Sequence, residues 1–202
     1  MSQYLIQGKT LTDIANAVRE KNGTTEPIKV SELPTEIANI QAGGGDSQWE
    51  GYWLRTATEF AIPEGTTTVS DYFFQNFTSL ASIELPNSIK SFGHYAFYRC
   101  TNLVLTELPS GTTSIGMLAF QTCRKLALTE IPSGITSIEM YAFENCTALT
   151  SITFKGKPNS IHSGAFNNCT NLTTINVPWA EGAVSGAPWG ATNATINYNY
   201  VG

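Results

Sequence analysis

Four cysteines are the residues whose type first suggests chemistry, because thiolates bind metals and take part in redox reactions. They are Cys100, Cys123, Cys146 and Cys169, and they recur at one constant interval along the chain. Zinc sites usually place paired ligands about two to four residues apart, whereas the same position one repeat earlier holds Phe77. Geometry does not exclude a disulfide between neighbouring repeats. We expect buried free thiols, with no metal site and no cofactor.

Three carboxylates recur at the same interval, at Glu84, Glu107 and Glu130, and the series continues with Thr153 and Asn176. In a strand they would point outward, opposite to Leu85 and its equivalents. Such a column is either a polar ligand face, for a cation or a polyhydroxyl surface, or a solvated edge copied with each repeat. A polysaccharide hydrolase would need two placed carboxylates. Stacked repeats offer these glutamates no asymmetric cleft, so we expect no catalytic residues.

A second outward column contains tyrosines at Tyr72, Tyr95 and Tyr141, interrupted by Leu118. Exposed tyrosines stack on sugars or anchor protein partners, and they also pack against one another. The sequence leaves these two interpretations open, and both columns are candidate ligand-binding surfaces. The pair Tyr98 and Arg99 is a weaker candidate of the same kind.

The remaining polar motifs give no catalytic arrangement. His94 and His162 occupy different positions relative to the repeat, so they form no triad with a nucleophile, and we expect surface histidines. The stretch "AGGGD" lacks the lysine and hydroxyl residue of a phosphate-binding loop, so we interpret it as a linker.

These residues are positioned by a repeat with a fixed period. The phenylalanines of its "AF"-type motif recur at that period, at Phe74, Phe97, Phe120, Phe143 and Phe166. A constant period of this length predicts a solenoid, in which each repeat buries its apolar face against its neighbours. Apolar columns also occur at positions −5, −1, +3 and +6 relative to the phenylalanine. This spacing predicts a short helix or helical turn at "YAFENCTAL", whereas "LTSITF" predicts a strand that pairs in parallel with its neighbours.

The stretches "LPSGTTSIGMLAFQTCRKL" and "IPSGITSIEMYAFENCTAL" resemble the BspA-type leucine-rich repeat, a bacterial variant, over residues 57–178. The resemblance implies an α/β repeat solenoid of right-handed, curved form with 23-residue units. It also implies a non-enzymatic protein that binds host proteins or surfaces.

The chain divides into three parts by composition. Short amphipathic patterns predict a small N-terminal helical segment for attachment or oligomerisation, followed by a glycine-rich linker. Aromatic residues Trp49, Tyr52 and Trp53 predict a cap over the first repeat, and Trp189 marks a degenerate last one. The predicted boundaries are 1–42 (helical segment), 43–47 (linker) and 48–202 (solenoid), with a cap at 48–56, repeats at 57–178 and a degenerate repeat and cap at 179–202.

Charge and hydropathy restrict the partners. The net charge of −5 disfavours nucleic acid. No apolar run reaches the length of about 18 residues that spans a membrane, and the N-terminus lacks a signal-peptide pattern, which favours synthesis and folding in the cytosol.

Both ends of the chain are similar to tail-associated proteins of phages and prophages infecting Gram-positive bacteria. The similar stretches are "YLIQGKTLTDIANAVREKNGTTEPIKVSELPTEIANI" and "VPWAEGAVSGAPWGATNATINYNY". This resemblance implies a virion protein, assembled in the host cytoplasm, that joins other tail proteins through its N-terminal segment and binds a polysaccharide or protein of the bacterial cell surface. The alternative is a bacterial surface adhesin that binds host proteins. A homo-oligomer is left open.

Overall fold

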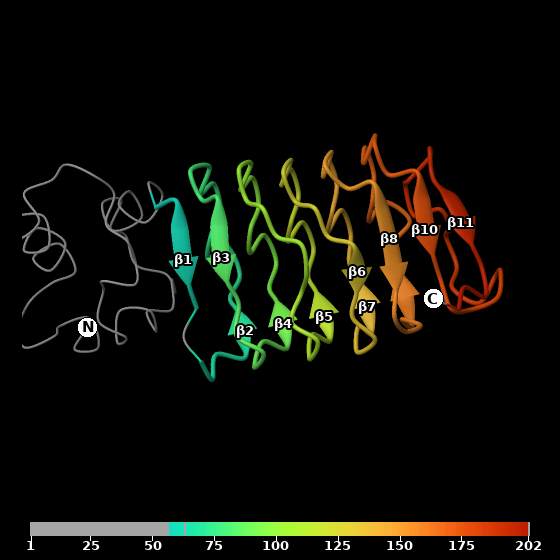
Figure 1. Ribbon diagram of the computed structural model, residues 1–202, viewed down its shortest axis with the longest axis horizontal. Coiled ribbons are helices and arrows are strands. Elements are labelled where there is room, and N and C mark those ends of the chain that lie inside the picture. Colours follow the sequence, from blue (N-terminus) through green and yellow to red (C-terminus); the bar gives the residue numbers. More distant parts are fainter. Residues whose placement is uncertain (1–56, 63, 202) are drawn as a thin grey trace, which may run out of the picture.

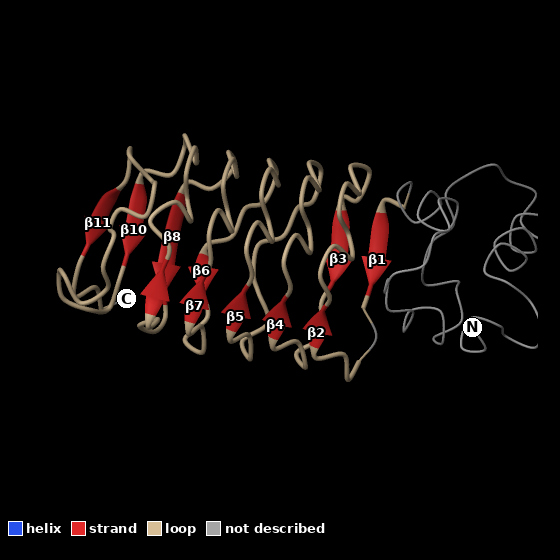
Figure 2. Ribbon diagram, turned by 180° about the vertical axis from the view of Figure 1, so that it is seen from behind, coloured by secondary structure: helices blue, strands red, loops and turns tan. Residues whose placement is uncertain are grey.

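The computed structural model describes residues 57–62 and 64–201, which form a parallel β-solenoid. Each turn of the chain, here called a rung, passes through two sides of the solenoid, and short strands lie on both (Figure 1). The described part contains strands and loops and no helix, as Figure 2 shows by colour. None of its elements is a helix of the length and apolarity that would cross a membrane.

One side of the solenoid carries a continuous sheet of five parallel strands in the order β2-β4-β5-β7-β9. In each strand a serine or threonine faces outward and the next residue is buried, because successive side chains alternate between faces. Each residue pairs with its equivalent in the next repeat, for example Phe92 with Ile115. The strands are Thr68–Val69, Ser91–Phe92, Ser114–Ile115, Ser137–Ile138 and Ser160–Ile161.

This sheet corrects one expectation from the sequence. The helical spacing predicts that the apolar column at position −5 from the repeat phenylalanine belongs to the helical element, and that prediction is wrong: Ile115 and its equivalents end strands. The column faces the same core as the phenylalanines, so spacing alone cannot distinguish a strand that leads into a turn from a helix.

The other side of the solenoid carries the strand that the sequence predicts after each repeat phenylalanine. Its strands are β1 Glu59–Ala61, β3 Ser82–Glu84, β6 Glu130–Ile131, β8 Ser151–Phe154, β10 Thr174–Asn176 and β11 Thr195–Asn197. They pair in parallel, as expected, but in two sheets, β1-β3 and β11-β10-β8-β6. The rung between β3 and β6 therefore interrupts this side.

The segment "YAFENCTAL" and its equivalents are turns rather than a helix. Their amide groups bond across rungs, as when Phe120 N–H donates to the Ala142 carbonyl oxygen at 2.8 Å. The backbone is left-handed at Tyr141 and Asn145, with φ of 56° and 60°. Such residues are incompatible with a right-handed helix, and the bonds to the next rung replace those that a helix would make.

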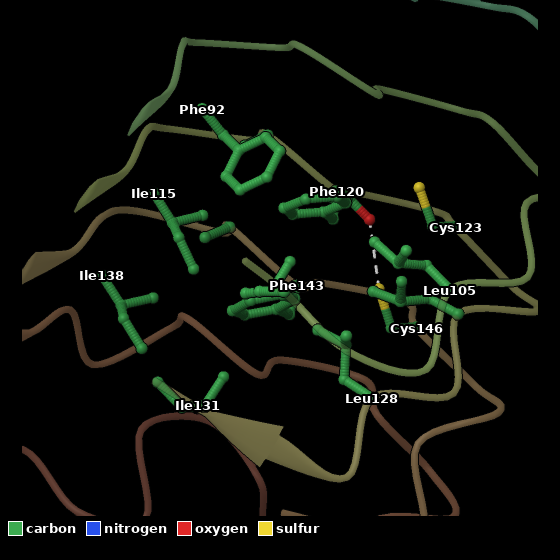
Figure 3. Packing of buried hydrophobic residues seen from close by; sticks show 14 of the residues in the cluster. Phe92, Leu105, Ile115, Phe120, Cys123, Leu128, Ile131, Ile138, Phe143 and Cys146 are labelled. Atoms are coloured by element: carbon green, nitrogen blue, oxygen red, sulfur yellow. Dashed lines mark hydrogen bonds between the residues drawn. The ribbon is translucent and has the colours of Figure 1, made fainter. Parts of the chain in front are cut away.

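The repeat phenylalanines form a stack along the axis of the solenoid, as the constant register predicts. Figure 3 shows two of its members, Phe120 and Phe143. Ring centroids of consecutive members from Phe74 to Phe166 lie 4.9–5.5 Å apart with interplanar angles of 4–9°. All five rings are fully buried. The core is therefore one continuous column, supported from rung to rung.

The C-terminal end closes this core with tryptophans. Trp189 takes the place of the phenylalanine, is fully buried, and donates its indole N–H to the Ser185 carbonyl at 2.8 Å. Trp179 packs edge-on against Phe154, with ring centroids 5.3 Å apart. Strand β11 is the edge strand of its sheet at this end of the solenoid. The predicted helical segment, glycine linker and aromatic cap of the first rung lie outside the described residues, and the division into three parts stays a prediction.

Candidate functional site

The four cysteines lie inside the solenoid, as the sequence predicts, and all four are free and buried. Each thiol donates to the carbonyl oxygen of the repeat phenylalanine one rung earlier, with S···O distances of 3.0–3.1 Å. Figure 3 shows this bond between Cys146 and Phe120. Each cysteine thus fills the core as a small apolar side chain, and its S–H group donates a weak hydrogen bond that links adjacent rungs.

Burial makes these thiols difficult to ionise. It raises the pKa of Cys100 and of Cys169 to about 12 from the usual 9.0, and that of Cys123 and Cys146 well above 9.0. The thiolate is the form of cysteine that acts as nucleophile and metal ligand, and burial disfavours this form at all four cysteines. Among the described residues no group of three or more His, Cys, Asp or Glu side chains is placed to hold a metal ion.

We expect a chromogenic thiol reagent to react slowly with the folded chain and with all four cysteines after denaturation. The reason is that the reagent reacts with an accessible thiolate. Burial keeps the reagent away from the sulfur atoms and raises the pKa of the thiols, so that they stay protonated. The measurement is a thiol titration with and without denaturant, and a metal analysis serves as its companion. Rapid labelling of the native chain, or one equivalent of tightly bound zinc in the purified protein, would contradict this prediction.

The glutamate column is exposed but discontinuous. Glu84 lies in β3 and Glu130 in β6, whereas Glu107 lies between them in the rung without a strand. Glu130 pairs with Lys155, its carboxylate oxygen 2.9 Å from Nζ. The three carboxylates therefore differ in their surroundings: Glu84 lies in an edge strand, Glu107 in a loop and Glu130 in an ion pair.

Toward the C-terminus the same column becomes a ladder of amides. Asn176 donates its side-chain NH₂ to the Thr153 hydroxyl oxygen at 3.1 Å. Asn197 donates to the Asn176 side-chain oxygen at 2.8 Å. These bonds occupy the polar groups within the solenoid, which favours a structural role for this end of the column.

The tyrosine column lies on the turns that follow the five-stranded sheet, a different arc of each rung from the glutamates. Tyr72 and Tyr95 stack, with ring centroids 4.8 Å apart and an interplanar angle of 12°. Tyr98 meets Tyr95 edge-on at 5.4 Å, and the Arg99 guanidinium lies 5.3 Å from the Tyr98 ring centre. We call Tyr72, Tyr95, Tyr98 and Arg99 the aromatic cluster; it joins two tyrosines of the column to the pair that the sequence indicates as the weaker candidate.

Tyr141 does not belong to the aromatic cluster. Leu118 separates it from Tyr95 along the column, and its ring lies above Gly164, where an added Cβ would be 2.7 Å from the ring. His162 meets the same ring at a centroid distance of 6.1 Å. Within the column, Tyr72 is 52% exposed and stacks on the half-buried Tyr95, whereas the half-buried Tyr141 packs against Gly164 and His162.

Both histidines hold the backbone of a turn. Nδ1 of His94 accepts from the Met117 N–H at 3.0 Å, and Nδ1 of His162 accepts from the Gly164 N–H at 3.1 Å. Glu139 Oε2 lies 3.6 Å from Nδ1 of His94. These contacts give both side chains a structural role in the turns, and His94 is half-buried rather than fully on the surface.

Comparison with known proteins agrees with this geometry. Six copies of the BspA type leucine rich repeat region match residues 67–182. The crystal structure of the leucine-rich repeat protein TpLRR of T. pallidum is similar, with a TM-score of 0.59 and 28% identity over 72% of this chain and 71% of that one. A search of curated proteins gives no significant match.

A leucine-rich cell surface protein of Faecalibacterium prausnitzii A2-165 is also similar in structure. Its TM-score is 0.58 and its identity 30%, over 72% of this chain and 36% of that one. Matching repeats cover more than half of the chain, and their phase agrees with the stacked phenylalanines and buried cysteines. The chain therefore belongs to the BspA-type leucine-rich repeat family.

Proposed function

We propose that the chain is a non-catalytic recognition module that binds a polysaccharide or protein of the bacterial cell surface. The observation that carries this proposal is the aromatic cluster, which places stacked rings and a guanidinium on the outside of a repeated scaffold. Flat aromatic side chains stack on sugar rings, and tyrosine and arginine are the usual anchors of protein interfaces. The membership in a leucine-rich repeat family supports a binding role.

The setting that we propose is the tail of a phage or prophage of a Gram-positive host. The two ends of the chain support it, because both are similar to tail-associated proteins. Residues 1–42 would then join other tail proteins, and the solenoid would face the host. Several copies on one tail would raise avidity by about 10²- to 10⁴-fold without new contacts, so that a weak single site would suffice.

A bacterial surface adhesin that binds host proteins is the second candidate. The similar protein of F. prausnitzii is described as a cell surface protein, which favours this setting. The genes beside the coding sequence discriminate between the two: tail, holin or endolysin genes support the phage setting, and a sortase or surface-protein cluster contradicts it.

We expect the full chain, displayed in many copies on a bead, to bind cells of the host, and we expect this binding to depend on the tyrosine column. Changing Tyr72, Tyr95 and Tyr141 together to alanine removes the stacked pair Tyr72–Tyr95 and the separate ring of Tyr141, and it should weaken binding by at least about tenfold. Changing Glu84, Glu107 and Glu130 together to alanine should have the smaller effect, because Glu130 is already paired. Flow cytometry of labelled beads on candidate cells measures both.

The matched control changes Ser91, Ser114 and Ser137 to alanine, which alters three strands of the five-stranded sheet at the same spacing. Each variant is used only if it melts like the wild type. Wild-type binding by both folded triple variants would show that the recognition surface is elsewhere. Competition by a peptide of residues 1–42 would show that the N-terminal segment, and not the solenoid, contacts the cell.

A further inference from the structure

The aromatic cluster contains a cation whose charge is not neutralised by direct pairing. The Arg99 side chain is exposed, and its guanidinium lies 5.3 Å from the centre of the Tyr98 ring. The ion pairs among the described residues are those of Lys155 and His94, so within this part of the chain Arg99 pairs with no carboxylate. The planar fork of N–H donors on its guanidinium is therefore available to a ligand.

The carboxylates on the same turns already have other partners. Oδ1 of Asp71 accepts from the His94 N–H at 2.7 Å. Glu144 accepts hydrogen bonds from side-chain amides in both neighbouring rungs. Since these groups do not reach Arg99, an anionic group from outside the chain can pair with it at short range.

The repeat itself does not require an arginine at this position. The equivalent residues are Asn76, Thr122, Asn145 and Asn168, and together with Arg99 they all have a left-handed backbone, with φ of 54–63°. Asparagine adopts this conformation more readily than most residues because its short polar side chain bonds locally, and arginine has no such advantage. The backbone thus explains the asparagines but not Arg99, which points to a role of the arginine side chain.

We propose that the aromatic cluster binds a sugar that carries a carboxylate or phosphate group. The Arg99 guanidinium forms a bidentate pair with the anionic group, and the sugar ring lies against the neighbouring tyrosines. One cation beside three aromatic rings matches a ligand with a single negative group on a body of apolar faces and hydroxyls. The net charge of −5 opposes the approach of a strongly acidic protein. This inference rests on the proposed function, because it assigns a ligand class to the same surface.

The test is a titration of the ¹⁵N-labelled full chain with glucuronic acid, glucose 6-phosphate and glucose, followed by NMR. We expect a Kd of about 1 mM for the better of the two charged sugars, with the largest shifts at the amides of Tyr98 and Arg99. Glucose should bind at least about tenfold more weakly, because it cannot form the charge-assisted pair. The charged sugar that binds more tightly identifies the anionic group, and added salt should weaken its binding.

Two variants take their new residue from other rungs, so they should keep the fold. Arg99→Asn introduces the residue that three equivalent positions have, and it should reduce the binding of the charged sugars to the level of glucose. Tyr98→Gln introduces the residue of both neighbouring rungs and removes the ring beside the guanidinium, so it should weaken charged and neutral sugars alike.

The matched control is Arg124→Thr. It also removes one exposed positive charge, at a position where the other four repeats have threonine. Because Arg124 lies outside the aromatic cluster, this change should alter the Kd by no more than about twofold. Melting curves establish that each variant folds, and Arg99→Gln replaces Arg99→Asn if the latter does not.

Several results would overturn the proposal: glucose binding as tightly as both charged sugars, no binding of either charged sugar, or undiminished binding by the folded variant at position 99. Shifts centred away from Tyr98 and Arg99 would contradict the site. An oligoglutamate peptide that binds more tightly than either sugar would indicate an acidic protein as the ligand. If the bead assay shows that cell binding depends on the tyrosines but not on Arg99, the proposed function stands and the anionic ligand is wrong.

Discussion

Replacing Phe120 or Phe143 with alanine is expected to lower the free energy of unfolding by about 3–5 kcal/mol. Both rings are fully buried in the axial stack, and Phe120 contacts a ring on either side, at centroid distances of 5.2 and 5.5 Å. Truncation removes the burial of one ring and leaves a cavity that both neighbours line. Because each rung is supported by its neighbours alone, the loss should spread along the solenoid.

Thermal melting followed by circular dichroism measures this effect, and a fall of roughly 6–20 °C corresponds to the expected loss. Tyr72→Ala is the matched control, since it also truncates an aromatic ring but one that is 52% exposed. Its melting temperature should change little. A Phe120 variant that melts within about one degree of the wild type would show that the stack does not support the fold.

Alkaline pH is expected to destabilise the solenoid through the four cysteines. Burial raises the pKa of each thiol above 9.0 in the folded chain, to about 12 for Cys100 and Cys169, whereas the unfolded chain ionises at its usual pKa. The unfolded state alone loses these protons as the pH rises above 9.0, so stability is full below that pH and declines toward pH 12. Above pH 9.0 each thiol should lower the free energy of unfolding by about 1.4 kcal/mol per pH unit, and the four thiols together by about 5 kcal/mol per pH unit.

Denaturant titrations under reducing conditions, at pH values from 8 to about 10.5, give the slope of stability against pH. Cys146→Ser is the matched variant, because its hydroxyl keeps a donor for the Phe120 carbonyl but does not ionise in this range. It should lower the slope above pH 9.0 by about a quarter of the thiol contribution. A slope unchanged by this substitution would mean that the thiols ionise equally in the folded chain.

The sequence alone determined the register of this protein. Its constant repeat period requires each residue to stack on its equivalent in the next rung. This predicted the parallel pairing, the phenylalanine stack and the inward cysteines, and the structure has all three.

The strands and turns within each rung could be assigned only from the tertiary structure. A buried residue every three or four positions fits a helix, a turn or the end of a strand equally well, so Ile115 gave no sign of its strand and "YAFENCTAL" no sign of its turns. The bonds from Phe120 to the next rung decide between them, and these join residues far apart in the sequence, such as Phe120 and Ala142. Such bonds depend on the neighbouring rung and leave no mark on the local pattern.

The candidate surfaces were likewise only half determined by the sequence. The repeat period determined which outward residues share a column. The residues that each of them contacts depend on the tertiary structure. Lys155 pairs with Glu130, and Leu118 separates Tyr141 from the stacked pair of Tyr72 and Tyr95. A column of equal residue types becomes a site only where its neighbours leave the side chains free, and that depends on packing between rungs, which spacing along the chain does not specify.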